Sequence, residues 1–242
     1  MKILAVDTAE QSCSIALVKD HVPICEEFCL SRQTHSRTLM DMIVHIVETR
    51  AGLTINDMDA FVVACGPGSF TGLRIGISIV KGLACATSKP SAGISSLDGI
   101  AFQFLASSVP VCVMMDARRG EVYSAVYNFK NGSLIQKSTE IVASPELAVE
   151  IATDSLSSRF AEMPVLFAGS GAVAFRSLIQ EMTGGTAIFA PVFQNFVRAS
   201  ALACKFFENS DLLSMSPDAV TPVYLRKSDA EINYQRQHQC YC

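Results

Sequence analysis

The sequence contains no tryptophan, few charged residues and only four histidines in 242 residues. Charged residues make up 17% of the chain and hydrophobic residues 50%, a balance that excludes a disordered chain and allows a large buried core. This length suits one large domain or two small ones. The formal net charge is −4, and no cluster of Lys and Arg exceeds the pair Arg118-Arg119. A protein that binds tRNA alone usually carries a basic face, so we expect any role on nucleic acid to be shared with a partner.

Residues that would support catalysis or bind a metal are also scarce. His35 and His45 are ten residues apart, too far for a helical pair of metal ligands. No Gly-x-Ser-x-Gly elbow occurs, and no histidine lies close in sequence to Ser12, Ser69 or Ser170. The sequence therefore predicts no catalytic residue and no metal site of its own.

The nine cysteines lack the spacing of a zinc site, and several fall within apolar runs, which favours buried thiols in a reducing compartment. Burial is also the favoured interpretation for Cys65, although a thiolate beside a glycine turn could be reactive. Cys240 and Cys242 fall far short of a zinc set and favour a mobile tail. No charged and apolar leader precedes the first strand pattern, and no run reaches the roughly 18 apolar residues of a membrane span. We expect a cytoplasmic protein that does not cross a membrane.

The most distinctive stretch is GPGSFTGLRIG, residues 66–76. It follows the apolar run 60–65 and leads into the apolar segment 77–86, so it predicts a strand, a tight turn and the start of a helix. Ser69 or Thr71 can cap that helix, an interpretation favoured over a bound anion. Gly72 and Gly76 repeat at four-residue spacing, although a glycine inside a helix costs about 1 kcal/mol. They predict a close backbone approach, either to the protein's own sheet or to a partner helix.

Period-two patterns predict an antiparallel group of strands at 3–8, 13–18 and 24–30, with the third at the edge. A strand at 91–95 and a short helix at 97–105 lead to a boundary near 107–110. The pattern then starts again with strands at 111–115, 122–129 and 134–142, the last two joined by a hairpin turn at Asn131-Gly132. Further expected elements are helices at 36–50 and 145–158, the latter capped by Ser144, a strand at 165–168 followed by a helix to about residue 182, and a last helix at 195–208.

The helix at 36–50 has an apolar arc wider than the roughly 100° that packing on one sheet requires. Together with the small-residue helix after Gly72, it favours a docking face of two helices over an ordinary core. The candidate interface residues are Leu39, Ile43, Ile46, Gly72, Arg74, Gly76, Ile79 and Val80.

Three blocks closely resemble the TsaB (YeaZ) family: ILAVDTA at 3–9, GPGSFTGLRIG at 66–76 and DARRGEVY at 116–123. They stand in the family's order and spacing, so the resemblance covers essentially the whole chain. That family helps bacteria make threonylcarbamoyladenosine in tRNA and belongs to the actin, hexokinase and Hsp70 superfamily. The resemblance implies an α/β fold of two ribonuclease-H-like subdomains, the second reduced. Its expected parts are 1–108 as the first subdomain, 109–194 as the second, 195–208 as a helix that packs back on the first, and 209–242 as a C-terminal extension.

The resemblance also implies partners. The family pairs through the two helices either with itself or with its catalytic relative TsaD, and it acts together with the small ATPase TsaE. A homodimer is expected in isolation, and contact with tRNA only through the complex. TsaD holds a metal with a helical His-x-x-x-His pair, but this chain has Ser96 and Ile100 at those two positions. The metal and the reaction centre are therefore expected in TsaD, and a metallopeptidase activity of this chain has no physical basis.

Ligand binding by this chain is expected to be weak or absent, with no cofactor of its own. Asp7 and Thr8 stand where the superfamily places its first phosphate loop, and a structural carboxylate is an equal alternative. Gly169 and Gly171 resemble an adenosine loop, which leaves weak nucleotide binding open. At the second phosphate loop, Arg118 and Arg119 replace glycines and could bind an anion or a partner carboxylate, with a solvated turn slightly favoured. Two other classes remain open: an autonomous small-molecule kinase or ATPase of the superfamily, and a homodimeric scaffold.

Overall fold

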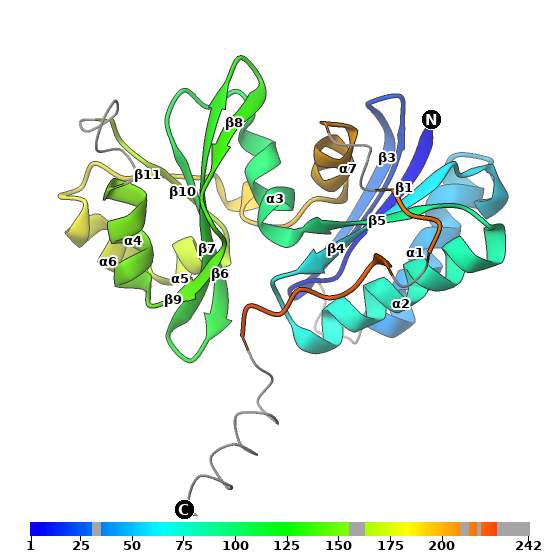
Figure 1. The fold of residues 1–242 in the computed structure, drawn as a ribbon, viewed down its shortest axis with the longest axis horizontal. Helices are drawn as coiled ribbons and strands as arrows, with labels where there is room; N and C mark the ends of the chain where they lie inside the picture. Colours follow the sequence, from blue (N-terminus) through cyan, green and yellow to red (C-terminus); the bar gives the residue numbers. More distant parts are fainter. Residues whose placement is uncertain (31–34, 155–162, 209–212, 217–218, 227–242) are drawn as a thin grey trace, which may run out of the picture.

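The computed structural model describes residues 1–30, 35–154, 163–208, 213–216 and 219–226. Two halves lie side by side, each built on one sheet (Figure 1). The first sheet has the strand order β3-β2-β1-β4-β5, and the second has the order β11-β10-β6-β7-β8 with β9 paired to β7. In each sheet three antiparallel strands are followed by two parallel ones. The expected α/β fold of two ribonuclease-H-like halves is confirmed, and the second is reduced because its last strand has only two residues.

The first half follows the predicted order of elements. Its strands are β1 (Lys2–Asp7), β2 (Ser12–Lys19), β3 (Val22–Leu30), β4 (Ala60–Gly66) and β5 (Ser91–Ser95). Its helices are α1 (His35–Val44), the π-helix η1 that continues it (His45–Arg50), α2 (Phe70–Thr87) and α3 (Ser96–Ala101), with 3-10 turns at Ile55–Asp57 and Phe102–Phe104.

The second half starts the same strand pattern again. Its strands are β6 (Val111–Arg118), β7 (Glu121–Lys130), β8 (Ser133–Lys137), β9 (Ile141–Ala143), β10 (Leu166–Ala168) and β11 (Ile188–Phe189). Its helices are α4 (Pro145–Asp154), α5 (Ser170–Ala174) and α6 (Arg176–Met182), with a 3-10 turn at Val192–Gln194, and α7 (Ala199–Glu208) follows. The division at residue 108 stays a prediction.

Both faces of the first sheet are covered, which explains why β1 and β2 are almost continuously apolar. α1 and α2 lie on one face, and α3 and α7 lie on the other (Figure 1). α7 packs on β1, β2 and β4, so the last helix returns to the first sheet. β3 is the edge strand, as its weak alternation predicts.

Some predicted elements have different ends. The strand expected at 134–142 is divided into β8 and β9, because the backbone N and the Oγ of Ser138 bond to Val126 between them. The helix after β10 is interrupted at Phe175, which separates α5 from α6. α4 carries the predicted Ser144 cap, whose Oγ accepts from the backbone N of Leu147 at 3.3 Å, and the last four positions predicted for it lie outside the described residues.

One carboxylate fixes the start of α7 to the sheet. Glu26 on β3 accepts hydrogen bonds from the guanidinium of Arg198, 2.9 Å away, and from the backbone N and Oγ of Ser200. Ser14 donates to the same carboxylate and accepts from the backbone N of Ala199. Burial by itself raises the pKa of Glu26, but these hydrogen bonds and the charge of Arg198 outweigh it and hold the pKa below its usual value. α7 therefore begins at Ala199 rather than at residue 195.

Replacing Glu26 by alanine is expected to lower the free energy of unfolding by about 3 kcal/mol at about pH 7, because Arg198 is left partly buried without its carboxylate. The folded-state pKa lies below the unfolded value of 4.5, so this contribution is present above that pH and is lost as the pH falls through the folded-state pKa. Urea unfolding on both sides of that pH measures the effect. The control is Glu27→Ala, which removes an exposed pair with His45 and should cost less than about 1 kcal/mol. Equal losses in the two variants would contradict this role of Glu26.

Candidate functional site

The glycine-rich stretch forms the predicted strand, turn and helix start. β4 ends at Gly66, and the Oγ of Ser69 caps α2 by accepting from the backbone N of Gly72 at 3.3 Å. The backbone N of Ser69 donates to the carbonyl of Ala9 at 2.7 Å. Free N–H groups at this helix end are thus used inside the fold, and the capped-end interpretation is confirmed.

Gly72 and Gly76 allow α2 to press against the end of β1. A Cβ on Gly72 would lie 2.1 Å from the carbonyl oxygen of Thr8, and a Cβ on Gly76 would lie 2.4 Å from the Oγ1 of Thr8. Both distances are far below van der Waals contact, so only glycine fits at either position. The close approach left open by the sequence is therefore made to the protein's own sheet.

The side chains of Asp7 and Thr8 are both engaged within the fold. Asp7 is fully buried and its Oδ1 accepts from the backbone N of Ala9 at 3.0 Å, as expected of a structural carboxylate. Burial, with the nearby charge of Glu10, raises the pKa of Asp7 well above its ordinary value. The Oγ1 of Thr8 donates to the carbonyl of Gly72 at 2.8 Å. A role of these two residues in binding a nucleotide stays a prediction.

The glycine loop of the second half packs against its own sheet. Gly169 has a φ of +103°, and a Cβ there would lie 2.3 Å from the carbonyl oxygen of Met114, while one on Gly171 would lie 3.0 Å from the same atom. The backbone N of Gly169 donates to the Oδ1 of Asn195 at 2.8 Å. Close packing explains both glycines, and their suggested contact with adenosine is a prediction that remains untested.

The loops that follow β1 and β10 touch each other across the two halves. The Oγ of Ser170, at the start of α5, donates to the carboxylate of Glu10 and accepts from the backbone N of Asp116 at 2.9 Å. Burial raises the pKa of Glu10 to about 7, with the charge of Asp116 adding to the shift and the Ser170 hydrogen bond opposing it. The bridge between Glu10 and Ser170 thus occupies the region where the superfamily's two ligand loops face each other.

Replacing Glu10 by glutamine is expected to raise the free energy of unfolding by about 2 kcal/mol at about pH 8 and to change it little at about pH 4. The folded-state pKa of about 7 lies above the ordinary value of 4.5, so the folded state holds the proton more tightly. The stability that this proton supplies is complete below about pH 4.5 and is lost as the pH rises through 7. Glutamine is neutral at both pH values and its Oε1 can still accept from Ser170. Urea unfolding at the two pH values measures the difference, and a variant destabilised at about pH 8 would contradict the expectation.

The two positions that correspond to the metal ligands of TsaD are buried. Ser96 and Ile100 are both fully buried in α3. Nearby, the Nζ of Lys137 lies 2.6 Å from the Oδ1 of Asp98 and 2.7 Å from the Oε1 of Glu140. Burial opposes the charge of Lys137, but the two carboxylates outweigh it and raise the pKa. Within the described parts of the chain, no group of three or more His, Cys, Asp and Glu could hold a metal ion.

The C-terminal segment touches both halves. The backbone N of Val223 donates to the carbonyl of Cys65 at 2.7 Å, and Tyr224 stacks on Phe70 with ring centroids 4.8 Å apart. In the second half, the guanidinium of Arg226 donates to the carbonyl of Ala117 at 2.9 Å. We call residues 220–226 the strap (Figure 1, orange). The sequence gave no periodic signal for it, because its contacts are made by single residues.

The arginine turn and Cys65 lie beside this strap. Arg118 and Arg119 have φ of +62° and +55° and exposed side chains, and the backbone N of Arg118 donates to the Oδ1 of Asp116. Burial raises the pKa of Cys65 to about 11, which supports the buried-thiol interpretation. Cys240 and Cys242 lie outside the described residues, as does the side chain of His35.

Most of the predicted interface residues lie inside the first half rather than on its surface. Six of them are buried: Leu39, Ile43, Ile46, Gly72, Gly76 and Val80. Ile79 is half-buried, and Arg74 is exposed, with its Nε 3.1 Å from the hydroxyl of Tyr224. The docking role stays a prediction, and any direct contact with a partner falls to the exposed neighbours of these residues.

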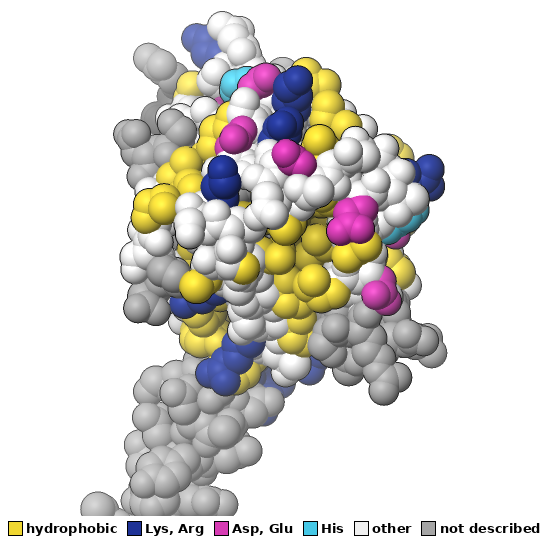
Figure 2. All heavy atoms as spheres, turned by 90° about the vertical axis from the view of Figure 1, so that its right-hand side faces the viewer, with side chains coloured by type: hydrophobic (Ala, Val, Ile, Leu, Met, Phe, Trp, Pro, Cys, Tyr) yellow, Lys and Arg dark blue, Asp and Glu magenta, His cyan; other side chains and the backbone are white. Residues whose placement is uncertain are grey.

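Those neighbours form two apolar stripes. Met40 and Val44, four residues apart on α1, are 40% and 44% exposed. Ile75, Ile79 and Leu83 repeat at the same spacing on α2 and are half-buried, and α1 packs against α2. Figure 2 shows hydrophobic side chains gathered on this side of the molecule with charged ones around them. We call these five residues the α1–α2 face.

α2 has a further property that follows from its composition. It is the one helix, among the residues that the structure describes, that is long and apolar enough to span a membrane. Length and composition alone are weak support for such a role, because a core helix of a soluble protein meets the same criteria.

Comparison with known proteins places this architecture in a family. The family described as "TsaD: tRNA N6-adenosine threonylcarbamoyltransferase" matches residues 29–234. The tRNA threonylcarbamoyladenosine biosynthesis protein TsaB of Bacillus subtilis is 32% identical over 97% of this chain and 98% of its own. The chain belongs to the TsaB family. The TsaB of Escherichia coli is also 32% identical, over 95% of this chain and 96% of its own.

Solved structures of the TsaB family agree with this assignment. YeaZ from Pseudomonas aeruginosa has a TM-score of 0.72 with 25% identity, covering 93% of this chain and 99% of that one. The resemblance carried by the three sequence blocks is thus confirmed over nearly the full length. The TsaB relatives differ in name from the catalytic TsaD, whose family description nevertheless matches most of this chain.

Proposed function

We propose that this chain is a non-catalytic subunit required for transfer of a threonylcarbamoyl group to the adenosine beside the tRNA anticodon. The observation that carries the proposal is the 32% identity with TsaB proteins over the full length of both chains. Burial of Ser96 and Ile100, at the positions of the metal ligands in TsaD, supports a role without catalysis. The reaction centre is then supplied by a partner.

The partner in this proposal is TsaD, held through the α1–α2 face, with TsaE supporting turnover. An exposed apolar surface formed by two helices suits docking of a related helical pair. To promote catalysis, the chain must bind the active conformation of TsaD more tightly than the inactive one. Without TsaD the same face would join two copies of this chain.

A reconstituted modification assay tests the proposal. Purified TsaD, TsaE, tRNA and threonylcarbamoyl-AMP, whose synthesis belongs to a separate enzyme, are incubated with and without this chain. We expect modified adenosine to form at a substantial rate only when the chain is present. Full modification in its absence would overturn the assignment.

An autonomous kinase or ATPase is the second candidate, favoured only by the two-halved fold that it shares with this superfamily. Titration calorimetry of the isolated chain with ATP and ADP separates the two candidates. We expect affinity in the millimolar range or none, because Asp7, Thr8 and Gly169 already bond within the fold. Micromolar binding with turnover of ATP would favour the enzyme.

A further inference from the structure

Two cysteines face each other across the first antiparallel strand pair. The register places Cys13 of β2 directly opposite Cys29 of β3. Opposite residues of an antiparallel pair have Cα atoms about 4.5 or 5.5 Å apart and Cβ atoms about 4.5–5.5 Å apart. A disulfide requires about 4.4–6.8 Å between Cα atoms and about 3.5–4.5 Å between Cβ atoms. The backbone therefore holds the two cysteines within reach of a disulfide, although both are free thiols here.

The two thiols differ in access. Cys13 is only 1% exposed, and burial raises its pKa to about 12, whereas Cys29 is half-buried. A small oxidant in solution therefore meets Cys29 first, and Cys13 is reached only from its neighbour.

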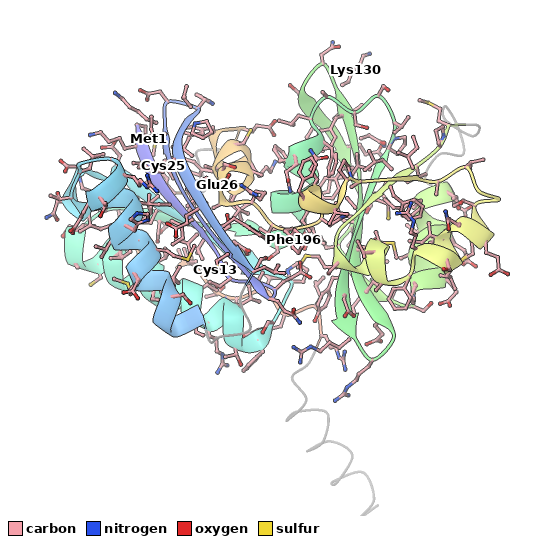
Figure 3. All side chains as sticks on the ribbon, turned by 180° about the vertical axis from the view of Figure 1, so that it is seen from behind. Met1, Cys13, Cys25, Glu26, Lys130 and Phe196 are labelled. Atoms are coloured by element: carbon pink, nitrogen blue, oxygen red, sulfur yellow. The ribbon has the colours of Figure 1, made fainter. Side chains whose placement is uncertain are left out.

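The cysteine pair lies on the sheet face that α1 and η1 cover. On β3, the Sγ of Cys25 lies 3.8 Å from the carbonyl oxygen of Ile46, and the carboxylate of Glu27 lies 2.9 Å from the Nδ1 of His45. Cys25, Glu27 and Cys29 alternate along one strand and so point to the same face. Figure 3 labels Cys13 and Cys25 on this sheet, beside α1.

We propose that Cys13 and Cys29 form a reversible intramolecular disulfide when the protein meets a low-molecular-weight disulfide such as oxidised glutathione. The thiolate of Cys29 attacks one glutathione sulfur, an S–S bond forms, and the other glutathione leaves as a thiolate that takes up a proton. The thiolate of Cys13 then attacks the Sγ of Cys29 and releases the second glutathione. The protein loses two electrons and two protons, and one glutathione disulfide becomes two thiols.

The crosslink would act beneath the α1–α2 face rather than on it. It would fix the register of β2 against β3, the strands on which α1 and η1 pack, without removing any exposed residue of that face. Reduction by dithiothreitol would restore the free pair.

Cys25 provides a matched control within the same strand. It is half-buried like Cys29 and points to the same face, but its partner in the register is Leu17. Any effect of accessibility or of strand position alone would therefore be shared by Cys25. Cys85 is exposed on α2 and reports whether the oxidant has reacted with an accessible thiol.

The experiment incubates the full chain with oxidised glutathione at mildly alkaline pH and maps the unreduced peptides by mass spectrometry. We expect a peptide pair that joins Cys13 to Cys29, lighter by two hydrogen atoms and separated by dithiothreitol. The link should persist in Cys25→Ser and be absent in Cys29→Ser.

Two results would overturn the proposal. One is a stable glutathione adduct on Cys29 beside a free Cys13. The other is a pair that stays fully reduced after Cys85 has reacted. Both are measured on the isolated chain without TsaD or tRNA, so failure here is distinct from failure of the proposed function.

Discussion

Replacing Gly72 by alanine is expected to lower the free energy of unfolding by about 3 kcal/mol or more, or to prevent folding altogether. The added Cβ would lie 2.1 Å from the carbonyl oxygen of Thr8, an atom of the backbone that no rotamer change can move. The Oγ1 of Thr8 also donates to the carbonyl of Gly72, so the two chain segments are held together from both sides. Separation of α2 from β1 is the only way to relieve the overlap.

Gly82→Ala is the matched control, since it makes the same change in the same helix. A Cβ on Gly82 meets no atom within 4 Å. Alanine favours the helix over glycine by about 1 kcal/mol, so this variant should be slightly more stable than the natural chain. Urea or thermal unfolding of the two variants measures a difference of about 4 kcal/mol between identical substitutions. Two variants of similar stability would show that the contact with Thr8 is not tight.

Replacing Val44 by glutamate is expected to weaken both self-association and binding to TsaD by at least about tenfold. Val44 is 44% exposed in the centre of the α1–α2 face, so a carboxylate there would be buried without a partner on docking, at a cost of about 2 kcal/mol or more. The fold itself should tolerate the change, because the side chain points to solvent in the single chain. Light scattering measures the dimer, and the reconstituted tRNA assay measures the loss of modification.

Val173→Glu is the control for this variant. Val173 lies on α5 in the second half and is 57% exposed, so the substitution adds the same charge far from the α1–α2 face. It should leave assembly and tRNA modification unchanged. If Val44→Glu assembled normally while remaining folded, the docking role of the α1–α2 face would be wrong.

Local patterns were sufficient to predict most of the strands. The alternation in 13–18 and 24–30, the turn residues Asn131-Gly132 and the cap at Ser144 each act over a few neighbouring residues. Their structural outcomes follow directly from that short range: β2 pairs with β3, β7 pairs with β8, and α4 begins at Pro145. The π-helix that ends α1 and the bend between β8 and β9 depend on tertiary packing, which no local pattern contains.

The candidate site was harder to predict because helical spacing identifies a face but not its neighbour. The four-residue repeat of Gly72 and Gly76 correctly indicated close packing, yet only the structure shows that Thr8 is the contact. The apolar residues Leu39, Ile43 and Ile46 were likewise seen as one arc, although the sheet buries them and leaves Met40 and Val44 outside. The contact between Glu10 and Ser170 joins residues 160 positions apart, beyond the reach of any sequence pattern.

The strap also bears on the mechanics of the whole molecule. The chain passes from the first half to the second before β6, returns with α7, and approaches the second half again where Arg226 meets Ala117 and Glu121. A clamshell rotation of the two halves would have to stretch three tethers at once. The Glu10 bridge and the Lys137 ion pairs oppose the same rotation. Torsional stiffness of this kind suits a rigid splint whose work is to hold another protein in one shape.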